Sequence, residues 1–324
     1  MDNLYTIKKP VEKELIDFEK HFRINLKSPV PLLDIITNYI LRRKGKQIRP
    51  LFVFLSAKLC GEVNKSTFTA ATLIELLHTA TLIHDDVVDE AYERRNYFSI
   101  NAIWKSKVAV LVGDYLLARG LLTSITENEY ELLKIVSEAV QEMSEGELLQ
   151  IQSSRKTIIN EVNYYEIIKK KTASLIGACT LSGAKSAKAN EKVSSIMKEF
   201  GISAGMAFQI KDDLFDYQVN GIMGKPVGND IKEKKFTLPL IIALQNSNLS
   251  DKKRILKLMN DNNNSLSKIS EIVKYVTEEN GIYEAEKIMN SFKNKALDVL
   301  SYFPDSDTKN SIFSLVNYII VRDN

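Results

Sequence analysis

The stretch T-L-I-E-L-L-H-T-A-T-L-I-H-D-D-V-V-D at positions 72–89 predicts the fold of this chain. Its apolar residues, such as Leu73, Leu77 and Ala80, recur at intervals of three and four, which is the spacing of one helical face. The helical pattern extends well beyond this stretch, because positions 51–225 contain no proline and prolines interrupt helices. The sequence therefore indicates an all-α protein built from long helices.

The expected helices follow from the same periodicity. An early helix near 32–44 is expected after two prolines, and Gly183 is expected to end a helix because glycine is common just beyond helix C-termini. No segment is long or polar enough to be a linker, so residues 1–324 are predicted to form one domain, a helical bundle around a central cavity. The remaining helices are predicted at about 66–92, 107–124, 128–153, 161–182 and 190–217, followed by shorter ones at 237–246, 251–261, 265–279, 281–300 and 306–322.

Composition and charge exclude several classes of protein. An apolar content of 44% is ample for a core, and a net charge of +3 with basic residues spread along the chain does not favour nucleic-acid binding. Cys60 and Cys179 lie far apart without a CxxC pattern, as is typical of reduced thiols in the cytoplasm. Neither an export signal nor an apolar run of membrane-spanning length is present, so we expect a cytoplasmic protein without a transmembrane anchor.

An acidic motif occurs twice, as D-D-V-V-D at 85–89 and D-D-L-F-D at 212–216. Aspartate is a poor helix former, and carboxylates on one helical face repel one another unless a cation lies between them. A solvated acidic face would explain either motif alone, but the flanks of both motifs are apolar. The pair therefore predicts a divalent metal site, with Mg²⁺ favoured because it prefers oxygen ligands and bridges substrate phosphates. The predicted metal ligands are Asp85, Asp86, Asp89, Asp212, Asp213 and Asp216.

Basic residues accompany the acids and complete a predicted diphosphate site. Any one of them alone is equally typical of a solvated surface charge, so their positions relative to the acidic motifs carry the prediction. The candidates are Lys46 and Arg49 in G-K-Q-I-R-P at 45–50, the pair Arg94 and Arg95 at the expected end of the first acidic helix, Lys171, Lys225 and Lys235.

Taken in order, these motifs resemble those of trans-type polyprenyl diphosphate synthases, the isoprenoid chain-elongating prenyltransferases, and among them the heptaprenyl and octaprenyl synthases. The resemblance covers roughly residues 40–240 and implies an isoprenoid synthase-type bundle, a homodimer, and a transferase acting on allylic and isopentenyl diphosphates. The matching segments are G-K-Q-I-R-P at 45–50, L-L-H-T-A-T-L-I-H-D-D-V-V-D at 76–89, R-R at 94–95, L-V-G-D-Y at 111–115, E-G-E-L-L-Q at 145–150, K-T at 171–172, F-Q-I-K-D-D-L-F-D-Y at 208–217 and G-K-P-V-G-N-D at 224–230.

The resemblance implies a role for each candidate residue. Asp85, Asp89 and Asp212 would coordinate a cluster of three Mg²⁺ ions, and the other three aspartates of the motifs would complete the metal shells. The residues implied to grip the allylic diphosphate are Arg94, Lys171, Lys225 and Lys235. Those implied to hold isopentenyl diphosphate are Lys46, Arg49, His78 and Arg95. Thr172 and Gln209 would offer oxygen dipoles to the allylic cation. Asn96 and Gln47 depart from the family's usual residues.

Small residues one helical turn before Asp85 bear on product length. Ala80 and Thr81 leave room for a growing chain that runs along the helix away from the acids, with Leu77, Leu73 and Met143 at greater depth. This pattern favours an all-trans product beyond twenty carbons, about thirty to forty, such as a quinone side chain. Close helix packing would also explain small residues here.

Several other functions are compatible with parts of this pattern. A geranylgeranyl or farnesyl synthase would differ only in product length, and a non-catalytic subunit of a heteromeric synthase would not need the intact acids and bases. A terpene cyclase would not need a second diphosphate site, and a metal-buffering protein would not need the lysines and arginines. The apolar product further suggests transient contact with a membrane.

Overall fold

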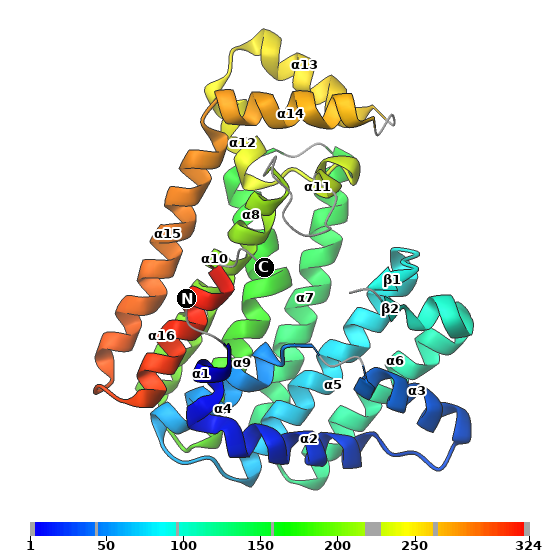
Figure 1. The fold of residues 1–324 in the computed structure, drawn as a ribbon, viewed down its shortest axis with the longest axis vertical. Coiled ribbons are helices and arrows are strands. Elements are labelled where there is room, and N and C mark those ends of the chain that lie inside the picture. Colours follow the sequence, from blue (N-terminus) through cyan, green and yellow to red (C-terminus); the bar gives the residue numbers. More distant parts are fainter. Residues whose placement is uncertain are drawn as a thin grey trace.

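The computed structural model of the protein describes residues 4–42, 45–94, 97–156, 159–217, 228–261 and 265–320. Apart from one two-stranded hairpin, the regular elements in these ranges are all helices, which confirms the all-α class (Figure 1). The first half contains α1 (Leu4–Lys8), η1 (Lys9–Val11), α2 (Glu12–Leu26), α3 (Pro31–Arg42), α4 (Ile48–Cys60), α5 (Lys65–Val88), β1 (Glu93–Arg94), β2 (Tyr97–Phe98), α6 (Ile100–Thr126) and α7 (Tyr130–Lys156). The second half contains α8 (Glu161–Ile168), η2 (Lys169–Ala173), α9 (Ser174–Ser186), α10 (Glu191–Phe215), α11 (Asn229–Lys232), α12 (Leu238–Asn246), α13 (Leu249–Asn260), α14 (Leu266–Glu278), α15 (Gly281–Val299), η3 (Leu300–Tyr302) and α16 (Asp307–Ile320).

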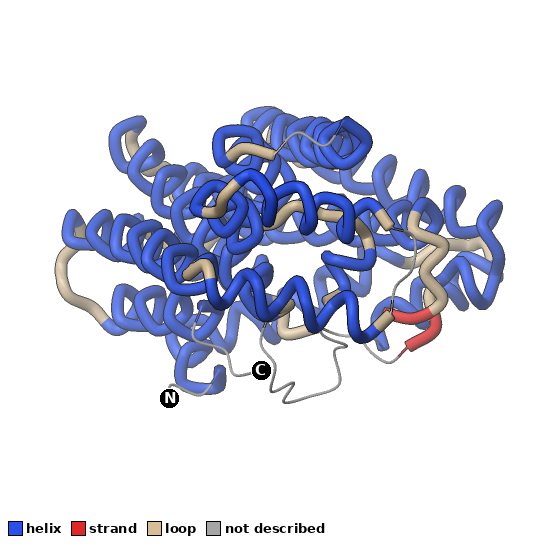
Figure 2. Tube along the Cα trace, turned by 90° about the horizontal axis from the view of Figure 1, so that it is seen from above, coloured by secondary structure: helices blue, strands red, loops and turns tan. Residues whose placement is uncertain are grey.

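The long helices α5, α7, α9 and α10 form the centre of the bundle, and the other helices surround them. In Figure 1, α2 and α3 lie along the base, α15 and α16 flank one side, and α13 and α14 cross the top. Seen from above, the hairpin β1–β2 lies at one edge of this assembly of helices (Figure 2). One large core cluster joins the central helices, and a second apolar cluster lies among α11 to α14.

The helix α5, which carries the first acidic motif, has well-defined ends. It begins with a capping box, in which the Asn64 side chain accepts from the Ser66 N–H at 2.9 Å and the Thr67 hydroxyl accepts from the Asn64 N–H at 3.2 Å. It ends at Val88, and Glu90 then adopts a left-handed conformation with φ of 50°. The predicted helix 66–92 was therefore too long, because the chain turns into a hairpin that the sequence analysis did not predict.

The predicted helix 161–182 is interrupted and extended. A π-helical turn, η2, separates α8 from α9, and α9 continues to Ser186, so the prediction that Gly183 ends a helix was wrong. A Cβ at Gly183 would lie 2.4 Å from the carbonyl oxygen of Val53 on α4. Glycine at this position allows the backbones of α9 and α4 to approach each other closely.

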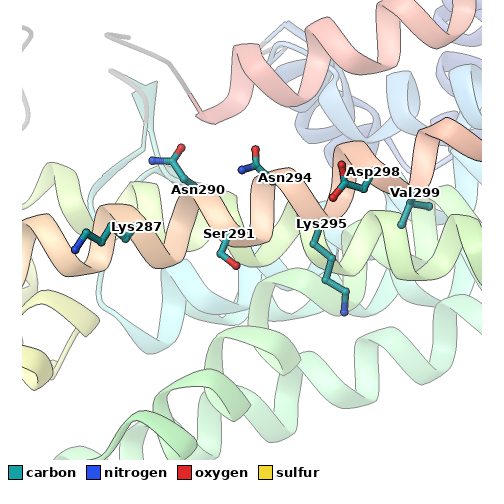
Figure 3. Close-up of a pocket in the computed structure, with 7 residues that line it drawn as sticks. All are labelled: Lys287, Asn290, Ser291, Asn294, Lys295, Asp298 and Val299. Carbon is teal, nitrogen blue, oxygen red and sulfur yellow. The ribbon is translucent and has the colours of Figure 1, made fainter.

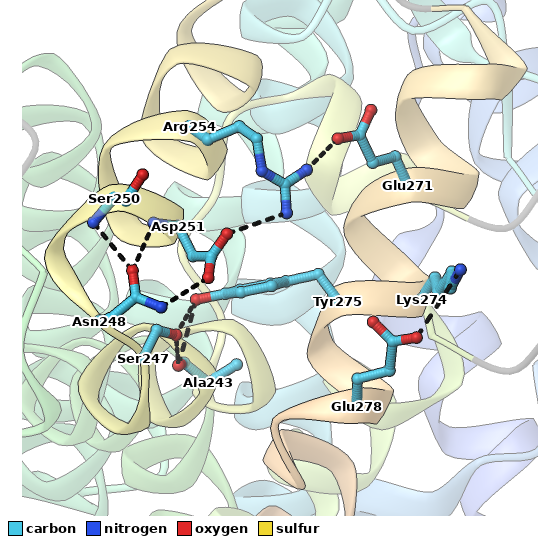
Figure 4. Close-up of polar contacts among 10 residues, drawn as sticks. All are labelled: Ala243, Ser247, Asn248, Ser250, Asp251, Arg254, Glu271, Lys274, Tyr275 and Glu278. Carbon is cyan, nitrogen blue, oxygen red and sulfur yellow. Dashed lines mark hydrogen bonds and ion pairs between the residues drawn. The ribbon is translucent and has the colours of Figure 1, made fainter.

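Polar contacts connect the helices around the second apolar cluster (Figure 4). The buried Tyr275 of α14 donates its hydroxyl to the Ala243 carbonyl at 3.2 Å and contacts Ser247 at the end of α12. Arg254 of α13 pairs with Glu271 of α14 across the surface. These contacts fix α13 and α14 onto α12; the division of the whole chain into domains stays a prediction.

Among the described helices, α6 alone is long and apolar enough to cross a membrane by length and composition. One side of α6 packs on α5, and its Arg119 donates to the Asn25 carbonyl of α2 at 2.7 Å. We therefore interpret α6 as a helix of the bundle with one exposed apolar face.

Candidate active site

The first acidic motif lies at the C-terminal end of α5. The side chain of Asp86 is buried, Asp85 is partly buried, and Asp89 is exposed and forms the C-cap, its N–H donating to the Asp85 carbonyl at 2.8 Å. The preceding residue, His84, is held by α6, because its Nε2 lies 3.5 Å from a carboxylate oxygen of Asp114. A Cβ at Gly113 would lie 2.1 Å from that nitrogen, so glycine makes room for the ring. The L-V-G-D-Y segment thus fixes the helix end that presents Asp85.

The second acidic motif lies at the C-terminal end of α10. Asp212 is exposed, whereas Asp213 is buried and accepts hydrogen bonds from the Tyr164 hydroxyl at 2.6 Å and from Gln209 Nε2 at 2.8 Å. The oxygen of the same Gln209 amide accepts from the Thr172 hydroxyl at 2.7 Å. Two predicted site residues, Thr172 and Gln209, are therefore linked to Asp213 by one hydrogen-bond chain. The sequence analysis assigned no role to Tyr164, since a lone tyrosine outside the motifs gives no signal.

Asp216 connects α10 to α11. Its carboxylate accepts from the backbone N–H groups of Asn229 at 2.8 Å and Asp230 at 3.0 Å. Asp230 is the last residue of the G-K-P-V-G-N-D segment and was assigned no role from the sequence. The structure places Asp230 next to the second acidic motif. Its place in a segment that the sequence analysis had singled out is the signal that could have identified it.

Burial and mutual repulsion raise the pKa values of these acids. Burial, with the nearby charge of Asp230, raises the pKa of Asp213 to about 8. Burial and the charge of Asp216 raise the pKa of Asp230 to about 6. The raised pKa values mean that ionising all of these carboxylates together is unfavourable without a neighbouring positive charge. A hard cation such as Mg²⁺ supplies that charge and prefers oxygen ligands, so the acidic set fits a Mg²⁺ site. Within the described ranges, however, no three His, Cys, Asp or Glu side chains converge on one point closely enough to hold an ion.

The lysine of the K-T segment lies on the π-helical turn η2, where α7 approaches very closely. A Cβ at Gly146 of α7 would lie 2.8 Å from the backbone nitrogen of Lys171. The glutamates on either side of this glycine meet the neighbouring lysines: Glu145 accepts from Lys170 at 2.6 Å, and Glu147 forms an ion pair with Lys171. The two glutamates of the E-G-E segment on α7 thus pair with two adjacent lysines, Lys170 and Lys171, on η2.

Three further contacts define the surroundings of the predicted diphosphate lysines. Lys171 donates to the side-chain oxygen of Gln150, also on α7, at 2.7 Å. Lys235 pairs with Glu233 and lies 4.0 Å from Asp230. Burial acts to lower the pKa of Lys235, but the neighbouring acids, Glu233, Asp230 and Glu147, raise it overall. Both lysines therefore have glutamate side chains as their ion-pair partners.

A cavity of about 630 Å³ brings together three of the four residues predicted to hold the second diphosphate. Lys46, Arg49 and His78 line it together with Asp86 of the first acidic motif. Its other walls are mainly apolar and include Phe52, Ile176, Phe208 and Ile319. The C-terminal helix α16 reaches this cavity through Ile319 and through Tyr318, whose ring centre lies 5.4 Å from the Lys46 nitrogen. The sequence analysis found no motif in that helix.

A wide, open hollow on the outer face of α15 does not belong to this site. Its lining residues all come from that one helix, and none belongs to a predicted motif (Figure 3). The residues drawn there, such as Lys287 and Lys295, already pair with Glu284 and Glu199. We therefore base the site on the acidic motifs and on the 630 Å³ cavity.

The residues predicted to set chain length lie in the interior of the bundle. Leu73, Leu77 and Ala80 are buried on α5, and Thr81 is partly buried with its hydroxyl donating to the His78 carbonyl at 2.9 Å. Met143 of α7 is partly buried against the main core.

Three of the predicted basic residues are not fully described. Lys225 and Arg95 lie outside the described residues, as does Asn96. The backbone of Arg94 lies on β1, beyond the end of α5, so its predicted place on the acidic helix was wrong. The left-handed Glu90 and the hairpin that follows explain this difference.

An all-α bundle that presents aspartate-rich motifs at two helix ends, next to lysines and an apolar-walled cavity, is the architecture of a prenyl-transferring enzyme of the isoprenoid synthase type. The model of the polyprenyl synthetase family matches residues 30–276. The chain belongs to this family and is a prenyltransferase.

Individual relatives agree with this assignment over nearly the whole chain. The octaprenyl diphosphate synthase of Haemophilus influenzae is 31% identical over 318 residues, which cover 98% of this chain and 96% of that protein. The crystal structure of a decaprenyl diphosphate synthase from Rhodobacter capsulatus superposes with a TM-score of 0.93 at 27% identity, covering 99% of this chain and 100% of that one. That of a geranylgeranyl pyrophosphate synthase from Bacteroides thetaiotaomicron gives a TM-score of 0.84 at 36% identity, with coverage of 99% and 100%.

Proposed function

We propose that this prenyltransferase condenses an allylic diphosphate with successive isopentenyl diphosphates to make an all-trans polyprenyl diphosphate beyond twenty carbons. The observation that carries the proposal is the pairing of two acidic helix ends with two separate groups of basic residues, one around Lys171 and one around Lys46. Two basic groups are what two diphosphate substrates require, because each diphosphate needs its own cationic partners.

In this proposal, Lys171 and Lys235 bind the diphosphate of the allylic substrate beside the acidic motifs, with Arg94 and Lys225 as further partners. Bound Mg²⁺, held by carboxylates of Asp85, Asp89 and Asp212, would stabilise negative charge on the departing diphosphate as a Lewis acid. Lys46, Arg49 and His78 hold isopentenyl diphosphate in the cavity that these three residues line, and Arg95 is a further proposed partner of that diphosphate. The apolar walls of that cavity exclude water, which would otherwise quench an allylic cation.

Product length depends on the space beyond Ala80 and Thr81. Neither residue is bulky, which supports a product beyond twenty carbons, about thirty to forty, that suits a quinone side chain. The similarity to a geranylgeranyl pyrophosphate synthase at 36% identity favours a shorter product as the second candidate. Because the longer product is apolar, the proposal includes a cytoplasmic enzyme that contacts a membrane transiently.

The test is a condensation assay. Purified protein receives farnesyl diphosphate, labelled isopentenyl diphosphate and Mg²⁺, and the dephosphorylated products are separated by chain length. We expect one long product that disappears with chelator and in Asp85→Ala. Asp17→Ala, which removes an exposed aspartate from α2, is the matched control and should retain activity. A twenty-carbon product would select the second candidate, and no condensation with any allylic primer would refute an active enzyme and favour a subunit that needs a partner.

We further propose a homodimer that forms through α6. Its outer face exposes Leu111, Leu122 and Ile125 by 59%, 55% and 47%, at spacings that place them on one side of the helix. Contiguous exposed apolar surface of this kind marks protein interfaces. Sedimentation analysis should give a dimer for the wild type and a monomer for Leu111→Glu combined with Leu122→Glu. Leu249→Glu, at an exposed position of α13, should remain dimeric; a wild-type monomer would refute this interface.

A further inference from the structure

Glu147 lies in the site but belongs neither to the two acidic motifs nor to the basic residues, so the proposed function gives it no role. It lies on α7, forms an ion pair with Lys171, and its charge also acts on Lys235. Both lysines are diphosphate ligands in the proposed function, on which the present inference rests. A carboxylate thus lies against the Lys171 ammonium group, which the substrate diphosphate must contact in that function.

The local packing of the backbone holds Glu147 and Lys171 next to each other. Gly146 brings α7 so close to η2 that a Cβ there would lie 2.8 Å from the backbone nitrogen of Lys171. The next residue, Glu147, is then held beside Lys171, and Gln150 one turn later accepts from the same ammonium group at 2.7 Å. Both Glu147 and Lys171 are about one-third exposed, so a ligand arriving from solvent can replace the contact.

We propose that Glu147 is a positioning residue that occupies the Lys171 ammonium while no diphosphate is bound and competes with diphosphate for it. The carboxylate keeps the lysine side chain extended toward the site when the site is empty. When diphosphate binds, the ammonium exchanges a carboxylate partner for phosphate oxygens, which carry more charge. When inorganic diphosphate leaves after each condensation, the carboxylate takes its place again.

The competition has a clear energetic direction. Neutralising Glu147 removes the charged partner of Lys171, leaves Gln150 as a neutral one, and keeps the shape of the side chain nearly unchanged. Partly exposed ion pairs contribute up to about 1 kcal/mol, which corresponds to roughly a two- to fivefold change in affinity. Glu147→Gln should therefore bind diphosphate more tightly, whereas the loss of a true metal ligand would weaken binding.

Glu145, on the other side of Gly146 from Glu147, provides a matched control. It accepts from Lys170 at 2.6 Å, so Glu145→Gln removes the same charge from the same helix without touching Lys171. Its neutralisation changes the general electrostatic field of the site in the same way. A gain found in Glu147→Gln and absent in Glu145→Gln therefore reports on the Lys171 contact.

The experiment measures inorganic diphosphate binding in the presence of Mg²⁺ by calorimetry, and KM and kcat with farnesyl diphosphate, in the wild type and both variants. We expect Glu147→Gln to bind inorganic diphosphate roughly two- to fivefold more tightly, with KM lowered by a similar factor and kcat not raised. Glu145→Gln should match the wild type. In a Lys171→Met background, Glu147→Gln should no longer tighten binding.

Unchanged or weaker diphosphate binding in Glu147→Gln would overturn the inference, as would an equal gain in Glu145→Gln. Failure of the proposed function gives a different result. In that case the wild type condenses no allylic diphosphate with isopentenyl diphosphate, while the difference between Glu147→Gln and Glu145→Gln in binding inorganic diphosphate would still decide whether Glu147 competes for Lys171.

Discussion

Replacing Gly146 by alanine tests how tightly α7 must pack against the π-helical turn. The added Cβ would lie 2.8 Å from the backbone nitrogen of Lys171 and 3.0 Å from the Lys170 Cβ, whereas ordinary van der Waals contacts begin at 3.4 Å. The helices must therefore separate by about 0.6 Å at this point, against backbone that cannot rotate away. Overpacking of this kind costs about 1–3 kcal/mol, and the better helix propensity of alanine returns about 1 kcal/mol.

The net expectation is a loss of stability of up to about 2 kcal/mol together with a functional defect. Separation of the helices moves Lys171 relative to its partners on α7, Glu147 and Gln150. A partly lost charge-assisted hydrogen bond should raise the KM for the allylic diphosphate about three- to tenfold. The assays are thermal unfolding, where each kcal/mol shifts Tm by about 2–4 °C in chains somewhat shorter than this one, and steady-state kinetics with farnesyl diphosphate.

Gly120→Ala is the matched control for this prediction. Gly120 also lies inside a long helix, but its nearest neighbours are the mobile ends of leucine side chains, at 3.2 Å for Leu73 and 3.5 Å for Leu77. Small side-chain shifts can accept the methyl group, so we expect an unchanged or slightly higher Tm and an unchanged KM. If Gly146→Ala behaves like Gly120→Ala in both assays, the close approach of α7 to η2 does not position Lys171.

Three further outcomes are expected. Thr81→Phe should shorten the product in the chain-length assay, because an aromatic ring one turn before the first acidic motif fills the space beyond it; an unchanged product would refute this path for the chain. Cys60 and Cys179 should react with a thiol reagent at pH 8 only after unfolding, because burial raises the pKa of each thiol to about 12; rapid labelling of the folded protein would contradict this. Burial lowers the pKa of His21, whose ring contacts the Thr72 hydroxyl at 3.0 Å, so the stabilising contribution of this histidine is present above about pH 6.5 and is lost as the pH falls. Melting curves of His21→Gln should therefore lack part of the acid destabilisation seen in the wild type. Identical pH profiles of the two proteins would count against this prediction.

Much of the site could be predicted because its residues belong to short segments with a strong local signal. The doubled D-D-x-x-D motif and the K-T pair are each contiguous, and their apolar flanks fix them on helices. Tyr164 and Glu147 could not be assigned, because each acquires its role from a residue more than ten positions away. No periodicity links such positions, and only packing brings them together.

The sequence by itself determined the all-α class, most of the helix positions and the placement of both acidic motifs on helices. It did so because helix formation depends on local spacing of apolar residues and on the absence of proline. Only the tertiary structure decided where α5 ends, that the chain turns into a hairpin before Arg94, and that a π-helical turn interrupts the predicted helix 161–182. It also decided which carboxylate lies against Lys171, because that contact depends on the close approach of α7 at Gly146 and on no property of either segment alone.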